Sequence, residues 1–265
     1  MQVVAIPLGN QYDHINYLLA CPETRQAVSV DPFDVDRILS ELSLRDLRLT
    51  AIVSTHEHWD HAGRNALLKS HTGAEVLVPR AAAGTIEHPD RLLSAGDEIS
   101  VGTSVPLRVL ATPGHTMAHI SLFGDDEGRP FLICGDTLFG AGVGNCGYGG
   151  FAPVLYETIA HVISALPDET IFYPGHDYLR RNLAFTLSID PENSVARQLA
   201  ADIERGDIAL PYFTTLEIER QINCFLRLDC PAVASHVDDA SSVSAAQSES
   251  RLGRFLKLRE LRDHW

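Results

Sequence analysis

Short apolar runs rich in β-branched and aromatic residues recur through the first two thirds of the chain, each bounded by glycine, proline or polar residues. Runs of this kind predict buried strands. Four of them occupy residues 50–54, 107–111, 131–134 and 171–173. Each is followed within a few positions by a histidine or an aspartate, namely His56, His115, Asp136 and His176. We therefore expect several strand ends to deliver these side chains to one place.

Segments with helical spacing of apolar residues alternate with these strands. They cover residues 34–42, 61–69 and 153–166, the last with proline in its first turn. Beyond His176 only helical patterns follow, at 180–188 and 193–205. The sequence therefore predicts an α+β protein in two parts. Residues 1–175 would form a domain that mixes strands and helices, and residues 176–265 a smaller helical domain.

The last thirty residues have two distinct patterns. Residues 236–250 are poor in bulky apolar side chains and predict a loop or linker. The tail that follows is amphipathic, with an apolar face and a basic face. The apolar face contains Leu252, Phe255, Leu256 and Leu258, and the basic face contains Arg251, Arg254, Lys257 and Arg262. The pattern favours a helix packed on its own domain over one that binds a membrane or a partner.

The most informative motif lies between Thr55 and Gly63, where the chain reads T-H-E-H-W-D-H-A-G. Three histidines and an aspartate fall within six positions: His56, His58, Asp60 and His61. Imidazole nitrogens and carboxylate oxygens are ligands of zinc, iron and manganese. A polar turn with solvated histidines is the alternative, but so crowded a cluster favours a metal site.

Composition sets the frame for this site. With 265 residues, 45% of them hydrophobic, the chain can bury a sizeable core. No apolar stretch approaches the ~18 to 20 residues of a membrane span, and the first residues do not resemble a secretory signal. Five scattered cysteines without paired spacing predict free thiols. We therefore expect a cytoplasmic protein with no membrane partner.

The formal net charge of -14 bears on possible partners. Binding to nucleic acid relies on extended patches of lysine and arginine, so nucleic acid is not an expected partner. Bound divalent cations would make the mouth of the metal site locally positive. An anionic small molecule therefore remains possible as a substrate.

Four motifs, T-H-x-H-x-D-H, T-P-G-H, G-D-T and G-H, occur in the order that resembles the metallo-β-lactamase superfamily. The resemblance implies two facing mixed β-sheets covered by helices on both outer sides. It also implies two divalent metal ions, and all seven ligand positions are filled. His56, His58 and His115 would bind one metal, Asp60, His61 and His176 the second, and Asp136 would bridge them.

Two later segments resemble glyoxalase II, the hydroxyacylglutathione hydrolases. They are G-H-D-Y-L-R-R-N-L-A-F at residues 175–185 and L-E-I-E-R-Q-I-N-C-F-L-R at residues 216–227. The resemblance implies hydrolysis of S-(2-hydroxyacyl)glutathione thioesters in methylglyoxal detoxification. We expect a monomer, with an oligomer as the alternative. The nucleophile would be a metal-bridging hydroxide rather than a side chain, with Asp60 and Asp136 as its supporting carboxylates. Zinc, iron and manganese all suit such ligands.

The same resemblance implicates Tyr178 and Arg227 in holding glutathione. Each has an alternative, because Tyr178 could pack at the domain junction and Arg227 could pair with Asp229 or a nearby glutamate. The chain also departs from the family in its glycine-rich segment, where Asn145 stands in place of an expected lysine or arginine. Tyr148 is a candidate to restore an aromatic contact there.

Supporting residues follow from the chemistry of metal-bound histidine, which usually donates its second N–H to an acceptor. Asp31 is the leading candidate for that role, and a turn residue before Pro32 is the alternative. We expect His119 to form local hydrogen bonds and Cys146 to be a passive thiol. The six remaining histidines are expected on the surface or on helices without a function: His14, His71, His88, His161, His236 and His264.

Two other functions fit parts of the sequence. A persulfide dioxygenase of the same fold would keep a single iron and a Y-P-x-H-D-Y segment like residues 173–178. The helical C-terminal third and the lack of that group's arginine-containing turn argue against it. A metal-binding scaffold without turnover is the other alternative, and seven intact ligand positions argue against that.

Overall fold

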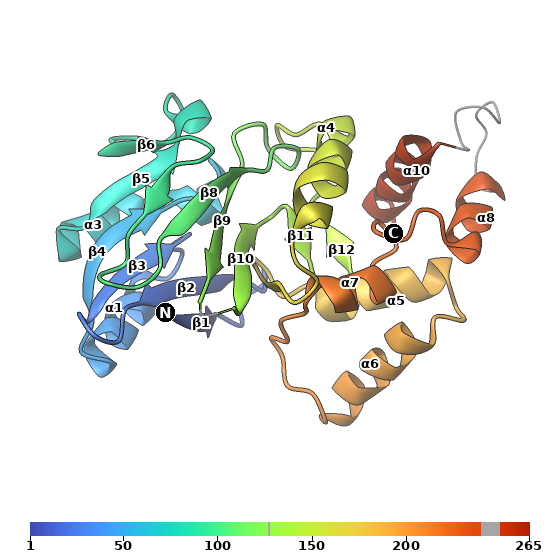
Figure 1. Cartoon of the computed structure of the whole chain (residues 1–265), viewed down its shortest axis with the longest axis horizontal. Coiled ribbons are helices and arrows are strands. Elements are labelled where there is room, and N and C mark those ends of the chain that lie inside the picture. The colour runs from blue at the N-terminus through green and yellow to red at the C-terminus, as the bar shows by residue number, and fades with distance from the viewer. Residues whose placement is uncertain (127, 240–249) are drawn as a thin grey trace.

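The computed structural model describes residues 1–126, 128–239 and 250–265, and it contains two facing β-sheets with helices on both outer sides (Figure 1). The first sheet has the order β1 (Gln2–Pro7), β2 (Ile15–Ala20), β3 (Gln26–Val30), β4 (Arg48–Val53), β5 (Glu75–Pro79) and β6 (Arg91–Leu93). The second has the order β13 (Ile171–Pro174), β10 (Pro130–Gly135), β9 (Ile120–Asp125), β8 (Leu107–Ala111) and β7 (Glu98–Ile99). A short hairpin of β11 (Leu138–Phe139) and β12 (Gly142–Val143) follows β10. The expected strands and the two-sheet architecture are confirmed.

Parallel pairs within these mixed sheets bring the functional loops together. In the first sheet β3 and β4 are parallel, and Val30 lies opposite Val53, so Asp31 emerges beside the loop that follows β4. In the second sheet β10 is parallel to β13 and antiparallel to β9. Asp136 and His176 therefore leave the sheet side by side. Because neighbouring parallel strands end at the same edge, residues distant in sequence meet there.

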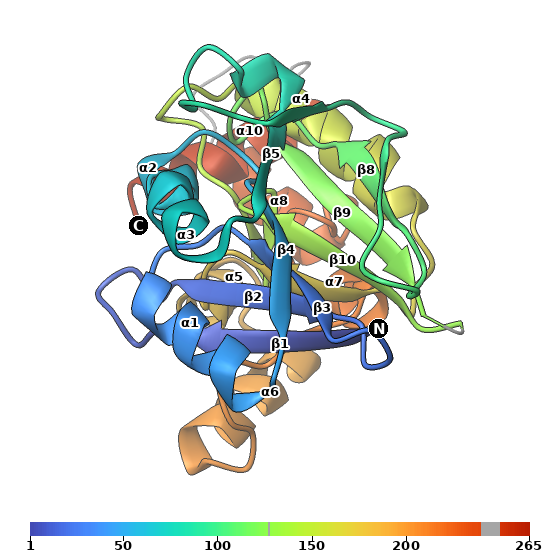
Figure 2. The same cartoon turned by 90° about the vertical axis from the view of Figure 1, so that its left-hand side faces the viewer.

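Apolar side chains fill the space between the sheets and under the helices. The inner layer is a buried cluster that includes Leu19, Val53, Val109, Leu122 and Ile133. Helices α1 (Val35–Leu44) and α3 (Asn65–Thr72) cover the outer face of the first sheet (Figure 2). Full burial of one such aliphatic side chain contributes about 1.5–3 kcal/mol, so these layers hold the strand ends in place.

Two predicted helices differ from the structure. The helix expected at 61–69 is divided at Gly63 into α2 (Trp59–Ala62) and α3. The backbone is close there, because a Cβ at Gly63 would lie 2.6 Å from the carbonyl oxygen of Trp59. The helix expected at 153–166 begins as α4 (Ala152–Glu157) and continues as a π-helical turn and a 3₁₀ turn. In that π-helical turn, the Thr158 hydroxyl donates to the carbonyl of Pro113 at 2.6 Å.

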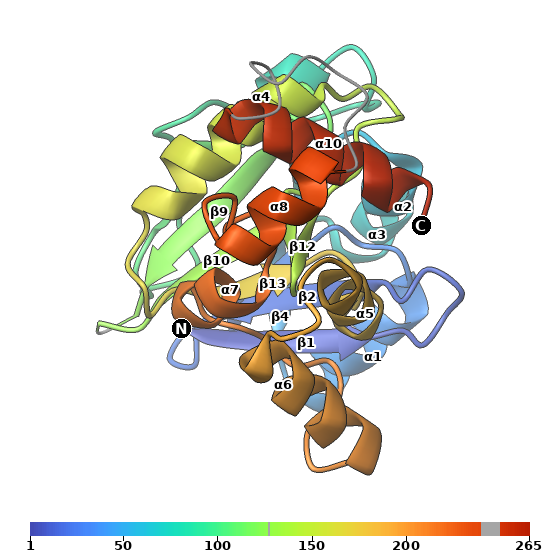
Figure 3. The same ribbon diagram turned by 90° about the vertical axis from the view of Figure 1, so that its right-hand side faces the viewer.

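The C-terminal third is helical, as expected, and covers the second sheet (Figure 3). Its helices are α5 (Leu179–Ile189), α6 (Ser194–Arg205), α7 (Leu216–Ile222), α8 (Pro231–Asp239) and α10 (Arg251–Asp263). The loop expected at 236–250 is wrong at its start, because residues 236–239 form the end of α8, and residues 240–249 lie outside the described ranges. The tail helix α10 packs on α4 and α8 with Phe255 and Leu258 buried, as the pattern favoured.

The helical third shares a hydrophobic core with the second sheet. Leu132 and Phe172 of that sheet belong to the same buried cluster as Phe185 and Phe225 of the helical part. The division into domains at residues 175 and 176 therefore stays a prediction. Within the described residues, none of the helices combines the length and the apolar character that crossing a membrane requires.

Candidate metal centre

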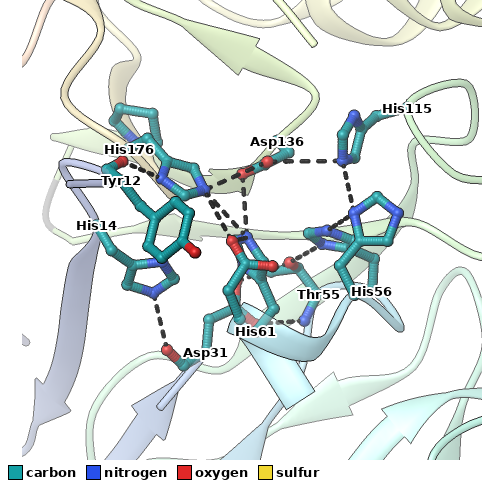
Figure 4. A network of polar contacts seen from close by, with 12 residues as sticks. Tyr12, His14, Asp31, Thr55, His56, His61, His115, Asp136 and His176 are labelled. Carbon is teal, nitrogen blue, oxygen red and sulfur yellow. Dashed lines mark hydrogen bonds and ion pairs between the residues drawn. The ribbon is translucent and has the colours of Figure 1, made fainter. Parts of the chain in front are cut away.

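The loops that follow β4, β8, β10 and β13 meet over one edge of the sheets, and they bring the expected histidines and aspartates together (Figure 4). His56, His58 and His115 form one group of closely spaced donor atoms. The His58 Nδ1 atom lies 3.0 Å from His56 Nε2 and 3.1 Å from His115 Nε2. These separations are close to the edge of a tetrahedron of ligands around zinc, about 3.4 Å for metal–nitrogen bonds of about 2.1 Å.

A second group surrounds His61 Nε2. This atom lies 3.3 Å from His176 Nε2 and 3.6 Å from Asp60 Oδ2. The Asp136 carboxylate lies between the two groups, with Oδ1 3.4 Å from His61 Nε2 and Oδ2 3.5 Å from both His115 Nε2 and His176 Nε2. The structure thus brings all seven expected side chains together in two adjoining sets.

In each of the five histidines, one ring nitrogen faces the other donor atoms of its group and is called the inner nitrogen. The other, outer nitrogen faces a hydrogen-bond acceptor. The acceptors are Thr55 Oγ1 for His56 (3.0 Å), the Tyr148 carbonyl for His58 (2.9 Å), Asp31 Oδ2 for His61 (2.9 Å), the Asn145 carbonyl for His115 (2.7 Å) and the Tyr12 carbonyl for His176 (2.7 Å). Thr55 must accept from His56, because its own hydroxyl donates to Asp31 Oδ2 at 2.7 Å. In a neutral imidazole only one nitrogen carries a proton. In the neutral form of each imidazole the inner nitrogen therefore presents a lone pair to the other donor atoms, and this arrangement fits a dinuclear metal site.

Asp31 makes the contact expected of a residue that orients a metal-binding histidine. Its carboxylate accepts hydrogen bonds from His61 Nδ1 and from both the backbone N–H and the hydroxyl of Thr55. Its backbone has φ +50°, a left-handed conformation that needs support. Asn16 gives that support, because its Nδ2 donates to the Asp31 carbonyl at 2.7 Å.

Electrostatics at the centre keep the carboxylate that lies between the two groups ionised. Burial opposes ionisation of Asp136, but His176 and His61 outweigh it and hold its pKa well below the usual value. Burial likewise opposes protonation of His61, yet Asp136 and Asp31 raise its pKa to about 9. Burial lowers the pKa of His56 well below its usual value. A cation placed among these groups would replace the proton that His61 otherwise retains.

Two further histidines lie against the centre. His119 is buried, stacks on His56 and accepts a hydrogen bond from the Asp136 backbone N–H, which agrees with the local bonding expected for it. His14 was expected on the surface or on a helix, and this is wrong. It is fully buried with its ring centroid 4.9 Å from those of both His61 and His176.

The other five histidines without an assigned function are exposed, as expected: His71, His88, His161, His236 and His264. His14 reaches the centre because it forms an isolated β-bridge with His176, which draws residues 10–14 against the loop that follows β13. A pairing of this kind leaves no spacing signal in the sequence.

A cavity of about 560 Å³ adjoins the centre, a volume typical of small-ligand sites. It is lined by Phe139, Val143, Asn145, Gly147, Tyr148, Tyr178, Arg181, Asn182, Arg259, Arg262 and Asp263. Its wall is attached to the metal-site histidines, because the carbonyls of Tyr148 and Asn145 accept from His58 and His115. The Tyr178 ring stacks on His176 with a centroid separation of 5.0 Å.

The arginines in this cavity differ from the one expected. Arg227 does not line it, and its guanidinium lies 2.9 Å from Asp190 rather than from Asp229 or a glutamate. Arg181, Arg259 and Arg262 line it instead, and Asp263 is the only acidic residue among the lining side chains. Of these three arginines, only Arg262 belongs to the basic face predicted for the tail. The cavity is thus locally cationic in a strongly acidic chain.

The glycine-rich turn between β11 and Asn145 is held by the C-terminal helices. Glu219 is fully buried, and both of its carboxylate oxygens accept from the backbone N–H of Ala141 at 3.1 Å. Asn223 donates to the Gly142 carbonyl, and Arg259 to the carbonyl of Val143 at 2.9 Å. Because this turn leads directly to the Asn145 carbonyl, the helical third positions the acceptor of His115.

Comparison with known proteins agrees with this architecture. Residues 22–176 match the family model described as the metallo-beta-lactamase superfamily, and residues 177–265 match the model of the hydroxyacylglutathione hydrolase C-terminus. The chain is 43% identical over 265 residues to a hydroxyacylglutathione hydrolase of Polaromonas sp. strain JS666, with 100% of both chains covered.

Solved structures of other proteins also resemble this chain. The ETHE1 structure from Myxococcus xanthus is 30% identical with a TM-score of 0.62, over 89% of this chain and 98% of that one. TTHA1623 in a di-iron-bound form is 25% identical with a TM-score of 0.60, over 84% of this chain and 100% of that one.

The two facing sheets and the paired histidine and aspartate clusters define a protein of the metallo-β-lactamase class. Within that class, the chain belongs to the hydroxyacylglutathione hydrolases. It is accordingly a metal-dependent hydrolase.

Proposed function

We propose that this enzyme hydrolyses S-(2-hydroxyacyl)glutathione thioesters, such as S-D-lactoylglutathione, to glutathione and a 2-hydroxy acid in methylglyoxal detoxification. The observation that carries the proposal is the cationic cavity joined to the metal centre through Tyr148, Asn145 and Tyr178. Glutathione has two carboxylates and one ammonium group, so its net charge suits a pocket with more arginines than aspartates. The thioester of a molecule bound there would lie beside the histidine clusters.

In this proposal each metal has its own set of side chains. His56, His58 and His115 would hold one cation, Asp60, His61 and His176 the other, and Asp136 would contact both. Bound together, the two cations would activate a water molecule as nucleophile and polarise the thioester carbonyl. Zinc, iron and manganese are candidates, and the di-iron form of a protein 25% identical to this chain supports iron.

The chain's own residues would bind and orient the thiol part of the substrate, with residues 176–265 as a substrate-binding domain. Most donors of the Arg259 guanidinium already face the turn carbonyls and Asp263. Arg262 forms no ion pair within the described residues and donates to the Asn182 amide oxygen. Burial and the neighbouring arginines lower its pKa to about 10, so it remains charged at neutral pH and would gain from a carboxylate partner. We therefore assign the glutathione carboxylates to Arg262 and the exposed Arg181.

The other proposed contacts come from the aromatic and amide residues of the cavity. The Tyr178 ring is held by its stack on His176, and Tyr178 lines the cavity. Tyr148 is 77% exposed and would cover a bound peptide backbone. Asn145 offers an amide in place of a cation. Arg227, paired with Asp190, would support the fold behind the cavity rather than bind the substrate.

The leaving group requires little help from side chains. A thiol with an ordinary pKa of about 8.5 leaves readily as its anion, so a strong general acid is not needed. Cys146 is the thiol nearest the cavity, and burial raises its pKa to about 11. It therefore stays protonated and passive, as the sequence suggested. All five cysteines are free, which supports a reducing compartment such as the cytoplasm.

The alternatives have less support. The persulfide dioxygenase is disfavoured because residues 177–265 match the hydroxyacylglutathione hydrolase C-terminus. A metal-binding scaffold without turnover would have no use for a cationic cavity that opens beside the metal centre.

The test is thiol release from two matched thioesters by protein of measured metal content. S-D-lactoylglutathione carries both carboxylates, whereas S-D-lactoyl-N-acetylcysteamine keeps the same thioester without them. We expect a much higher kcat/KM for the glutathione thioester. Equal values would leave a thioester hydrolase but refute glutathione as its thiol. Oxygen uptake with glutathione persulfide would instead support the dioxygenase.

A further inference from the structure

His14 lies at the metal centre beside the histidines that were expected as ligands. It directly precedes β2, has no solvent exposure, and its ring centroid is 4.9 Å from those of His61 and His176. A donor atom of His14 falls within 4.8 Å of donor atoms of Asp60, His61 and His176. Figure 4 shows its ring beside that of His176, on the side of the centre that Asp31 also borders.

The hydrogen bonding of His14 follows the pattern of the five histidines that were expected as ligands. Its Nε2 atom lies 3.3 Å from the carbonyl oxygen of Asp31. A carbonyl oxygen can only accept, so Nε2 carries the proton and Nδ1 carries a lone pair. The Nδ1 atom is buried and has no hydrogen-bond partner within the described part of the chain. Buried polar atoms are rarely left without a partner, so this one calls for a ligand.

We propose that His14 Nδ1 is an additional ligand of the metal held by Asp60, His61 and His176. The proposal rests on the dinuclear centre of the proposed function and not on the identity of the substrate. It accounts for the unpartnered nitrogen, for the burial of a polar ring among three other ligands, and for the β-bridge that fixes residue 14 against residue 176.

An extra imidazole has a consequence for the choice of metal. With His14, five side chains would address the second cation: His14, Asp60, His61, Asp136 and His176. Structural zinc is almost always four-coordinate, whereas iron and manganese accept six ligands. The second site should therefore favour iron or manganese more strongly than the first site, which three histidines and the bridging carboxylate define.

Two substitutions separate direct binding from an indirect effect through Asp31. In His14→Asn the amide oxygen can take the place of Nδ1, while the contact with the Asp31 carbonyl is lost. In His14→Gln the amide reaches the position of Nε2 and can still donate to that carbonyl, while no acceptor remains at Nδ1. Direct binding predicts that His14→Gln weakens the second metal by at least about tenfold. His14→Asn should retain most of the affinity.

The measurement is stepwise metal binding by the apoprotein in competition with a chromophoric chelator, using Co²⁺ and Mn²⁺. Circular dichroism of each apoprotein establishes that it is folded, and His88→Gln, an exposed histidine, is the control. Weakening of one of the two binding steps alone in His14→Gln, with stronger Co²⁺ absorption from a lower coordination number, supports the proposal. Unchanged affinity at both steps in His14→Gln, or a larger loss in His14→Asn than in His14→Gln, overturns it. Because no substrate is used, failure here is distinct from failure of the proposed reaction.

Discussion

Glu219→Gln is expected to change how the stability of the protein depends on pH. Glu219 is fully buried on α7, and its carboxylate accepts from the Ala141 backbone N–H, the Thr214 hydroxyl and the Asn223 amide. Burial outweighs these hydrogen bonds and raises its pKa from 4.5 to about 7. Glutamine keeps the shape and one acceptor oxygen but cannot ionise, so it removes this titration.

The sign and size follow from proton linkage. Between pH 4.5 and about 7 the folded protein keeps the proton on Glu219, whereas the unfolded chain loses it. The folded state binds more protons in this window, so the contribution of Glu219 to stability is full below pH 4.5 and is lost as pH rises to about 7. At 1.36 kcal/mol for each pKa unit, a pKa difference of about 2.5 corresponds to about 3 kcal/mol.

The assay is urea unfolding of metal-free wild type and Glu219→Gln at several pH values from 5 to 8. We expect the free energy of unfolding of the wild type, relative to the variant, to fall by about 2.5 kcal/mol from pH 5 to pH 8, because part of the effect is already lost at pH 5. Glu217→Gln, on the exposed face of the same helix, is the control and should show no such trend. A difference between wild type and Glu219→Gln that is constant with pH would refute the reasoning.

Three further predictions concern the centre and the cavity. Asp136→Ala should lose two-metal binding and activity, since it removes the only side chain that lies between the two clusters in the described structure; metal analysis showing two metals with normal turnover would contradict this. Asp31→Asn removes the carboxylate shared by His61 and Thr55, and chelator titration should show metal affinity lower by about 10- to 100-fold. Arg262→Ala should raise KM with little change in kcat, because Arg262 lines the cavity. Arg227→Ala breaks a buried ion pair, so it should cost about 3 kcal/mol of stability and leave KM unchanged. If KM rose in Arg227→Ala and stayed constant in Arg262→Ala, Arg227 and not Arg262 would bind glutathione.

The sequence determined the fold class and the seven side chains of the centre. Strand patterns are local, because they depend on the length of a short apolar run, its β-branched and aromatic residues and the glycine or proline that bounds it. The ligand motifs are also local, since each follows a strand end directly. For the same reason Asp31 could be predicted: it ends a strand, and a metal-binding histidine needs an acceptor.

Only the tertiary structure decided which residues surround that centre. His14 lies there because its segment bridges to the loop after β13, a pairing across more than 160 positions that no spacing reveals. In the sequence, Arg259 and Arg262 look like basic residues on the solvated face of a helix. They line the cavity only because α10 packs on α4. Arg227 belongs to a family motif, but its ion pair with Asp190 depends on packing that the motif does not reveal. A local pattern indicates the chemistry that a side chain offers. Which residue it contacts depends on how distant segments of the chain pack.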